Sequence, residues 1–188
     1  MSLRPSRRVA LVAVVAVLAA VAARIAAPAP QHHVRYSAAL RCGSERWLVK
    51  TLQDRPRLIR AKASTVANLT GLPRPTPFPT TRLPTERHIY SVMAAVTLIR
   101  SEADQDLHVV LEDGPAHMIA ESPTVPACTV KATAYRRRQM RDARNAVRLC
   151  AQARVVGVAF WDFRHNQTGV APNAIELHPI LGFTCLST

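Results

Sequence analysis

The residues that could carry chemistry lie where charged and imidazole side chains alternate with apolar ones. Asp106 and His108 are two residues apart, and Glu176 and His178 repeat this spacing. In a strand, residues two apart project from the same face, so each pair predicts a carboxylate beside an imidazole. Such pairs hold divalent metals or carry out general acid–base chemistry. With Glu121, just before a Ser-Pro turn, they form a candidate set for a divalent ion, zinc or manganese.

These residues must be positioned by a small β domain. The apolar and turn patterns predict three strands, a helix and two strands. The expected segments are 89–99, 107–112, 117–121, the helical region 131–151, 154–163 and 175–183. This order is typical of a small OB-like antiparallel barrel (β-β-β-α-β-β), mostly β with one helix. An open α+β sheet with the helix on one face is the alternative.

In such a barrel we expect the second and fifth strands both to lie next to the first. Their polar faces would then meet near one mouth of the barrel. Glu121 ends the third strand, and we expect that strand to pair with the fifth and so bring Glu121 to the group. In the opposing interpretation the polar faces diverge, and each residue satisfies the backbone of its own loop.

Other polar residues flank this set. Glu102 and Asp104 extend the two-residue spacing before Asp106, and we interpret them as a solvated strand face. Asp162, His165 and Asn173 lie on or beside the loop between the last two strands. That loop group is a second place for chemistry, or a set of side chains that bond to loop backbone.

The expected helix carries a basic stripe. Its arginines recur at steps of four, three and four: Arg137, Arg141, Arg144 and Arg148. An apolar stripe that includes Met140 and Ala143 lies on another face of the helix. A row of guanidinium groups can follow the phosphates of a nucleic acid or the charges of an anionic glycan. The alternative is a solvated face that keeps the protein soluble.

The N-terminal region is typical of export. Arginines at 4, 7 and 8 precede an unbroken apolar run at 9–23, and Ala27-Pro28-Ala29 resembles a cleavage pattern. Residues 1–30 therefore form an expected signal peptide, or an anchor if they are not cleaved. We expect an N-terminal extension at 31–72, a proline-rich connector at 73–85 and the OB-like domain at 86–188.

Charge and cysteine content narrow the partners and the compartment. The formal net charge is +13, and removal of residues 1–30 would leave +9, which favours an anionic polymer as partner. Membrane contact would require an uncleaved N-terminal segment. Four cysteines without a C-x-x-C pair predict two disulfides in an exported chain. Three pairings are possible, and we favour Cys128 with Cys150 and Cys42 with Cys185.

Three segments also carry a resemblance. They are CGSERWLVKT from Cys42, MIAE from Met118 and GVAPNAIELHP from Gly169. The chain thereby resembles a family of uncharacterised exported bacterial proteins, over residues 42 to 182. The resemblance implies export and no known activity.

Three possible functions remain. The chain is interpreted first as an exported non-catalytic binding or structural domain, with an anionic polymer among its candidate ligands. The alternative is a metal-assisted hydrolase that acts on a phosphate or glycan substrate. A third possibility is a cell-envelope protein held by its uncleaved N-terminus.

Overall fold

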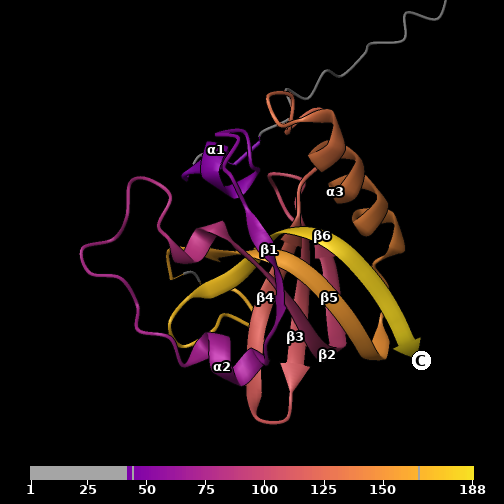
Figure 1. The fold of residues 1–188 in the computed structure, drawn as a ribbon. Helices are drawn as coiled ribbons and strands as arrows, with labels where there is room; N and C mark the ends of the chain where they lie inside the picture. The colour runs from indigo at the N-terminus through magenta and orange to yellow at the C-terminus, as the bar shows by residue number, and fades with distance from the viewer. Residues whose placement is uncertain (1–41, 44, 165) are drawn as a thin grey trace, which may run out of the picture. The chain divides into compact units, whose positions relative to one another are not determined.

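A computed structural model describes residues 42–43, 45–164 and 166–188, which belong to one compact unit (Figure 1). The expected signal peptide at 1–30 lies outside the described residues. The N-terminal part contains α1 (Trp47–Lys50), β1 (Ile59–Ala63), α2 (Val66–Thr70) and a 3-10 turn, η1 (Thr85–Arg87). The remaining elements are β2 (His88–Ser101), β3 (Leu107–Asp113), β4 (Ala116–Ser122), α3 (Ala134–Ala146), β5 (Cys150–Trp161) and β6 (Ile175–Ser187).

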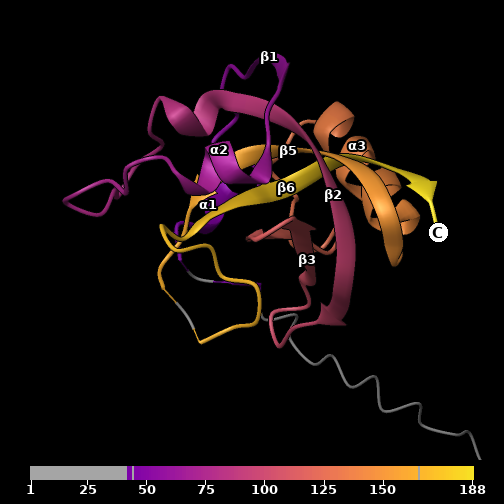
Figure 2. The same cartoon turned by 90° about the horizontal axis from the view of Figure 1, so that it is seen from below.

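The sheet closes on itself. β2, β3 and β4 pair antiparallel in sequence order, and β4 then pairs parallel with β6. β6 pairs antiparallel with β5, and β5 pairs antiparallel with β2, which completes the ring (Figures 1 and 2). This order and the parallel contact define an OB-like barrel, so the expected fold class is confirmed, and the open α+β sheet is excluded.

The expected neighbours within the ring were partly wrong. β3 lies between β2 and β4, and β6 lies between β4 and β5, so β2 does not flank both strands. The expected pairing of the third and fifth strands is confirmed, because Ile119 on β4 faces Glu176 on β6. β4 is therefore the strand that brings the polar residues of β3 and β6 to one place.

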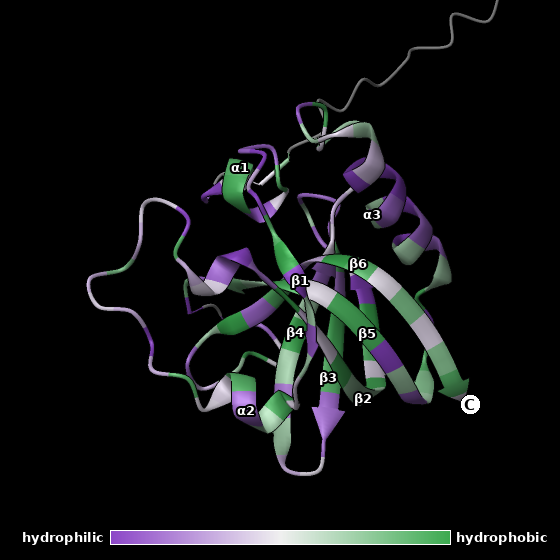
Figure 3. Cartoon of the chain, in the orientation of Figure 1, coloured by the Kyte–Doolittle hydropathy of each residue, from purple (hydrophilic) through white to green (hydrophobic). Residues whose placement is uncertain are grey.

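Strand alternation builds the barrel core. Val109 and Leu111 of β3 and Leu177 of β6 belong to one buried apolar cluster. Apolar and polar residues alternate along these strands (Figure 3). A second cluster, which includes Met140 of α3 and Leu181 of β6, packs the helix against the sheet. Because His108, Glu121 and His178 alternate with core residues, they project from the opposite face of their strands, away from the main core.

The N-terminal extension differs in part from what its local pattern indicates. The run from Glu45 to Leu52 has the pattern of a short strand, yet it contains the helix α1; Arg46 and Leu52, on either side of it, have φ values of 48° and 58°. A short apolar run is compatible with either element, because its periodicity is too brief to decide. The pattern of residues 65–72 indicates a helical turn, and this segment contains α2, whose cap Thr65 accepts from the backbone N–H of Asn68. β1 was not expected, because its alternation of apolar and charged residues spans only five positions, and all five are exposed.

The four cysteines form two disulfides, as expected, but the favoured pairing was wrong. The bridges join Cys42 to Cys128 and Cys150 to Cys185. Cys150 begins β5, and the antiparallel partner strand β6 carries Cys185, so strand pairing decides this bridge. The other bridge holds the chain before α1 to the segment between β4 and α3. None of the helices in the described part of the chain has the length and apolar character needed to cross a membrane.

Candidate metal centre

The polar residues from β3, β4 and β6 form one buried cluster under a cover of two further segments. α1 covers it from one side, because the Lys50 ammonium reaches 3.1 Å from Glu121 Oε2. The loop between β5 and β6 covers it from another. Gly169 lies against Val110 on β3, where an added Cβ would come within 2.7 Å of a valine methyl, and its φ of +85° also favours glycine. This close approach places the loop carbonyl of Thr168 next to His108.

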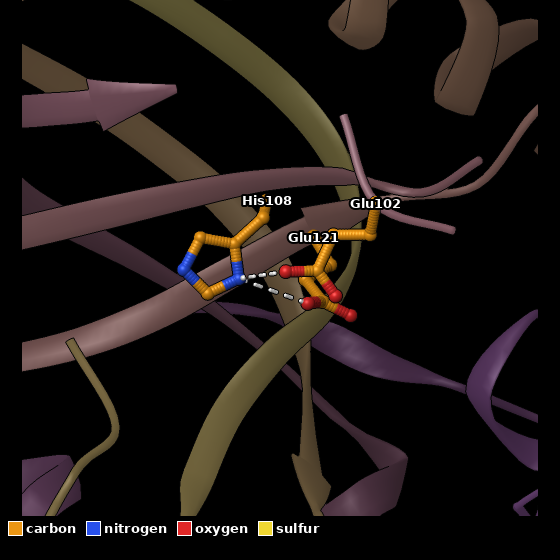
Figure 4. A group of neighbouring side chains, drawn as sticks. All are labelled: Glu102, His108 and Glu121. Atoms are coloured by element: carbon orange, nitrogen blue, oxygen red, sulfur yellow. Dashed lines mark hydrogen bonds and ion pairs between the residues drawn. The ribbon is translucent and has the colours of Figure 1, made fainter. Parts of the chain in front are cut away.

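His108 has one nitrogen bonded to backbone and the other directed at carboxylates. Its Nε2 lies 2.9 Å from the carbonyl oxygen of Thr168. A carbonyl can only accept, so Nε2 carries the hydrogen in this contact. Its Nδ1 lies 3.2 Å from Glu121 Oε1 and 3.4 Å from Glu102 Oε1. Figure 4 shows both carboxylates directed at the same ring nitrogen.

Glu102 reaches this position because the chain turns back between β2 and β3. Its backbone N–H donates to the carbonyl of Asp106, and Gln105 within the turn has a φ of 68°. Two side chains hold the Glu102 carboxylate from outside. Arg100 Nη2 lies 3.0 Å from Oε1, and Gln167 Nε2 lies 2.6 Å from Oε2. Glu102 is thus part of the cluster, and its interpretation as a solvated strand residue was wrong.

His178 repeats the arrangement of His108 with its nitrogens exchanged. Its Nδ1 lies 2.8 Å from the carbonyl oxygen of Lys50, so Nδ1 carries the hydrogen. Its Nε2 lies 2.8 Å from Asp106 Oδ2 and 3.5 Å from Glu121 Oε2. Both histidines and Asp106 are fully buried, with no exposed surface. Glu121 is therefore shared, with one oxygen toward each histidine.

Lys50 supplies the positive charge that the strands lack. Its Nζ lies 3.1 Å from Glu121, 3.2 Å from Asp162 and 3.6 Å from Glu176. Burial alone would lower the pKa of this ammonium, but these carboxylates and Asp106 outweigh burial and hold the pKa well above its ordinary value. Lys50 is therefore a fixed cation at neutral pH and does not serve as a nucleophile or a base.

The carboxylates differ in how far nearby positive charge offsets the cost of their burial. Burial would raise the pKa of Glu121, but the hydrogen bond from His108 and the charges of Lys50 and His178 lower it to about 2. Burial raises the pKa of Glu176 well above its ordinary value, and the nearby Asp162 and Glu121 add to the rise. The Lys50 ammonium, 3.6 Å from Glu176 Oε1, opposes this rise only in part.

The cluster contains more buried acid than fixed base. Four carboxyl groups in it are at least nine-tenths buried: Asp106, Glu121, Asp162 and Glu176. The Lys50 ammonium pairs with the last three, and the positive charge of Arg144 acts on Asp106. Two oxygens, Asp106 Oδ1 and Glu176 Oε1, are buried without a hydrogen-bond partner among the described residues. Buried anions require protons or cations to compensate them, so the cluster has the electrostatics of a cation site.

The cluster opens on a cavity of about 320 Å³. Glu102 and Glu121 line it, together with Trp47 of α1. Further acidic groups on its wall are Glu45, Asp104 and Asp162. Burial raises the pKa of Asp104, and the negative charge of Asp106 adds to this rise. The wall is thus acidic although the whole chain is strongly basic.

The structure brings together all five residues that the sequence singled out for a metal. They are Asp106, His108, Glu121, Glu176 and His178. Of the loop group, Asp162 joins the cluster through Lys50. Asn173 does not, because its amide donates to the carbonyls of Leu69 and Leu72. His165 lies outside the described residues. Sequence reasoning missed Lys50, whose one signal is a lysine set in an apolar run.

The arginine stripe of α3 is not one continuous free surface. Arg144 donates to the backbone carbonyls of Ser122 and Gln105, and Arg137 donates to those of Val130 and Ala132. Arg141 is exposed beside Asp142. The fourth, Arg148, follows the last residue of the helix. At least two of the four guanidinium groups therefore bind the chain's own backbone, and anion binding by this face stays a prediction.

Comparisons with known proteins identify no relative. No protein-family profile matches the sequence, and no characterised protein matches it significantly. Solved structures give weak matches. A structure assigned as aspartyl-tRNA synthetase of Leishmania major Friedlin has 13% identity, a TM-score of 0.41 and coverage of 67% of this chain and 21% of that chain. Asparaginyl-tRNA synthetase of Entamoeba histolytica has 10% identity, a TM-score of 0.39 and coverage of 69% and 24%. The chain thus spans about a quarter or less of these proteins.

Proposed function

We propose that this chain is an exported binding domain that holds one divalent transition-metal ion between Glu102, His108 and Glu121. The observation that carries the proposal is the orientation of His108. A histidine that ligates a metal donates its other N–H to a carbonyl or carboxylate, and that contact fixes the ring. His108 has this arrangement, with Nε2 at Thr168 and Nδ1 directed at two carboxylates.

The three ligand atoms suit a small divalent ion. One atom from each of Glu102, His108 and Glu121 lies within 4.8 Å of the others. An imidazole nitrogen with two carboxylate oxygens suits zinc or manganese better than calcium, which takes six to eight oxygen ligands. Glu102 and Glu121 also line the cavity, so an ion here would have coordination positions open to small molecules.

Export is part of the same proposal. Two disulfides are typical of an oxidising compartment outside the cytoplasm. The basic start and apolar run at 9–23 supply a route to that compartment. The resemblance to uncharacterised exported proteins supports the same location.

A metal-assisted hydrolase is the second candidate, and the cavity beside the three ligands favours it. Catalytic metal sites keep three protein ligands and a free position, which this group would provide. Lys50 is the one cation among the described residues that line the cavity, and three carboxylates surround it. A phosphate or anionic polymer would meet an acidic wall, so the wall favours a neutral glycan over a phosphate as substrate.

Metal content tests the binding proposal. The full mature protein is stripped with chelator, dialysed against zinc or manganese, and analysed for bound metal. We expect about one equivalent in the wild type and in the His117→Ala control, because His117 is exposed on β4, away from the cluster. His108→Ala should lose the metal while thermal unfolding shows that it still folds. A folded wild type that retains less than about a tenth of an equivalent contradicts the proposal.

A further inference from the structure

The cluster contains a second group of three ligands that mirrors the first. Asp106, Glu121 and His178 each offer one ligand atom, and these atoms lie within 4.8 Å of one another. As at His108, one ring nitrogen of His178 is bonded to backbone and the other is directed at carboxylates. Glu121 belongs to both groups, with Oε1 near His108 and Oε2 near His178.

What distinguishes the second group is Lys50. The ammonium lies 3.1 Å from Glu121 Oε2, the same oxygen that lies 3.5 Å from His178 Nε2. The first group also has a cation, since Arg100 Nη2 lies 3.0 Å from Glu102 Oε1, but the Arg100 side chain is 41% exposed and screened by solvent, whereas Lys50 is buried. A divalent ion between Asp106 and His178 would share its bridging oxygen with a fixed positive charge and be repelled by it.

A second observation points to a cation in this place. Asp106 is fully buried, and its Oδ1 has no hydrogen-bond partner among the described residues. An orphaned carboxylate oxygen in a dry site is costly, and a coordinated ion would compensate it. Lys50 does not do so, since its ion pairs are with Glu121, Asp162 and Glu176.

We infer that Asp106, Glu121 and His178 form a second divalent-cation position, bridged to the first by Glu121, and that the Lys50 ammonium keeps this position closed. The inference rests on the proposed function, because Glu121 is the ligand that the two positions share. Lys50 thus acts as a specificity residue: it limits the cluster to a single divalent ion. Removal of its charge converts the cluster to a two-ion site.

The test is metal stoichiometry by elemental analysis and calorimetric titration with zinc. Lys50→Met alone leaves buried carboxylates uncompensated and can impair folding. The principal variant is therefore Lys50→Met with Glu176→Gln, which removes the ammonium together with one of the carboxyl groups that it contacts. Glu176 belongs to neither group of ligands, so the Glu176→Gln single variant is its control. Lys62→Met, at an exposed lysine, controls for loss of a lysine as such.

We expect about one equivalent of zinc in the wild type and in both controls, and about two in the double variant. Adding His178→Ala to the double variant should return it to one. A folded double variant that binds one equivalent overturns the inference and leaves the first site intact. If the wild type binds no metal, the proposed function fails. If the double variant then binds one equivalent that His178→Ala removes, the second position still stands.

Discussion

Replacement of Glu121 by glutamine tests how strongly the cluster holds a carboxylate in the absence of metal. The pKa of Glu121 falls from an ordinary 4.5 to about 2, because His108, Lys50 and His178 outweigh burial. At about 1.4 kcal/mol per tenfold change in proton affinity, this corresponds to about 3 kcal/mol of stability at neutral pH. Glu121 is only 3% exposed, so solvent screening reduces this little. We expect Glu121→Gln to lower the free energy of unfolding by about 3 kcal/mol at pH 7.

The pH dependence makes the test specific. A group whose folded pKa is lowered stabilises the fold above its unfolded pKa, and that stability is lost as pH falls. The difference between wild type and Glu121→Gln should therefore shrink between pH 4.5 and about 2. It is measured by urea unfolding in chelator, with disulfides intact.

Glu176→Gln is the internal control with the opposite sign. Burial raises the pKa of Glu176, so its contribution to stability is present below 4.5 and is lost as pH rises. We expect Glu176→Gln to gain stability relative to wild type as pH rises above 4.5. A Glu121→Gln variant that is as stable as wild type at pH 7, or a deficit that does not change with pH, would refute this account of the electrostatics.

Two further predictions concern the disulfides and hydrogen bonds that stabilise the fold around the cluster. Non-reducing peptide mapping should recover the bridges Cys42–Cys128 and Cys150–Cys185, and removing the first, with its sequence separation of 86, should cost about 4 to 5 kcal/mol. A map with any other pairing, or an unchanged stability, would count against the fold. Arg144→Ala should cost about 1–3 kcal/mol in thermal or urea unfolding, because two backbone carbonyls lose their donor, whereas exposed Arg141→Ala should change stability by less than about 0.5 kcal/mol. Equal effects of the two substitutions would mean that Arg144 is as free as Arg141.

The barrel could be predicted from the sequence because its strands alternate clearly. On β3, apolar residues such as Leu107 and Val109 face the core, and His108 between them projects to the other face. The same period places Glu176 and His178 together on β6. The partner of β6 could not be derived from local pattern, because strand order depends on long-range pairing. As expected, β4 brings the polar residues of β3 and β6 together. The expectation that β2 lies next to both of these strands was wrong.

Lys50 and Glu102 could not be assigned to the site from the sequence, because their placement depends on tertiary contacts. Lys50 lies on a four-residue helix whose position is set by contacts distant in sequence, including the ion pair of Arg46 with Glu86. Glu102 returns to the cluster through a turn whose Gln105 adopts an unusual backbone conformation. The pairing of Cys150 with Cys185 likewise follows from which strands lie side by side. In each case, nearby residues in sequence do not carry the information.

The position of a bound ion tests the central claim most directly. Crystals of the mature protein are grown with zinc or manganese, and anomalous diffraction is measured at the absorption edge of the metal. We expect a peak within about 2.0 to 2.2 Å of His108 Nδ1 and of carboxylate oxygens from Glu102 and Glu121. An anomalous map with no peak among these three side chains, in crystals soaked at saturating metal, would contradict the proposed metal centre.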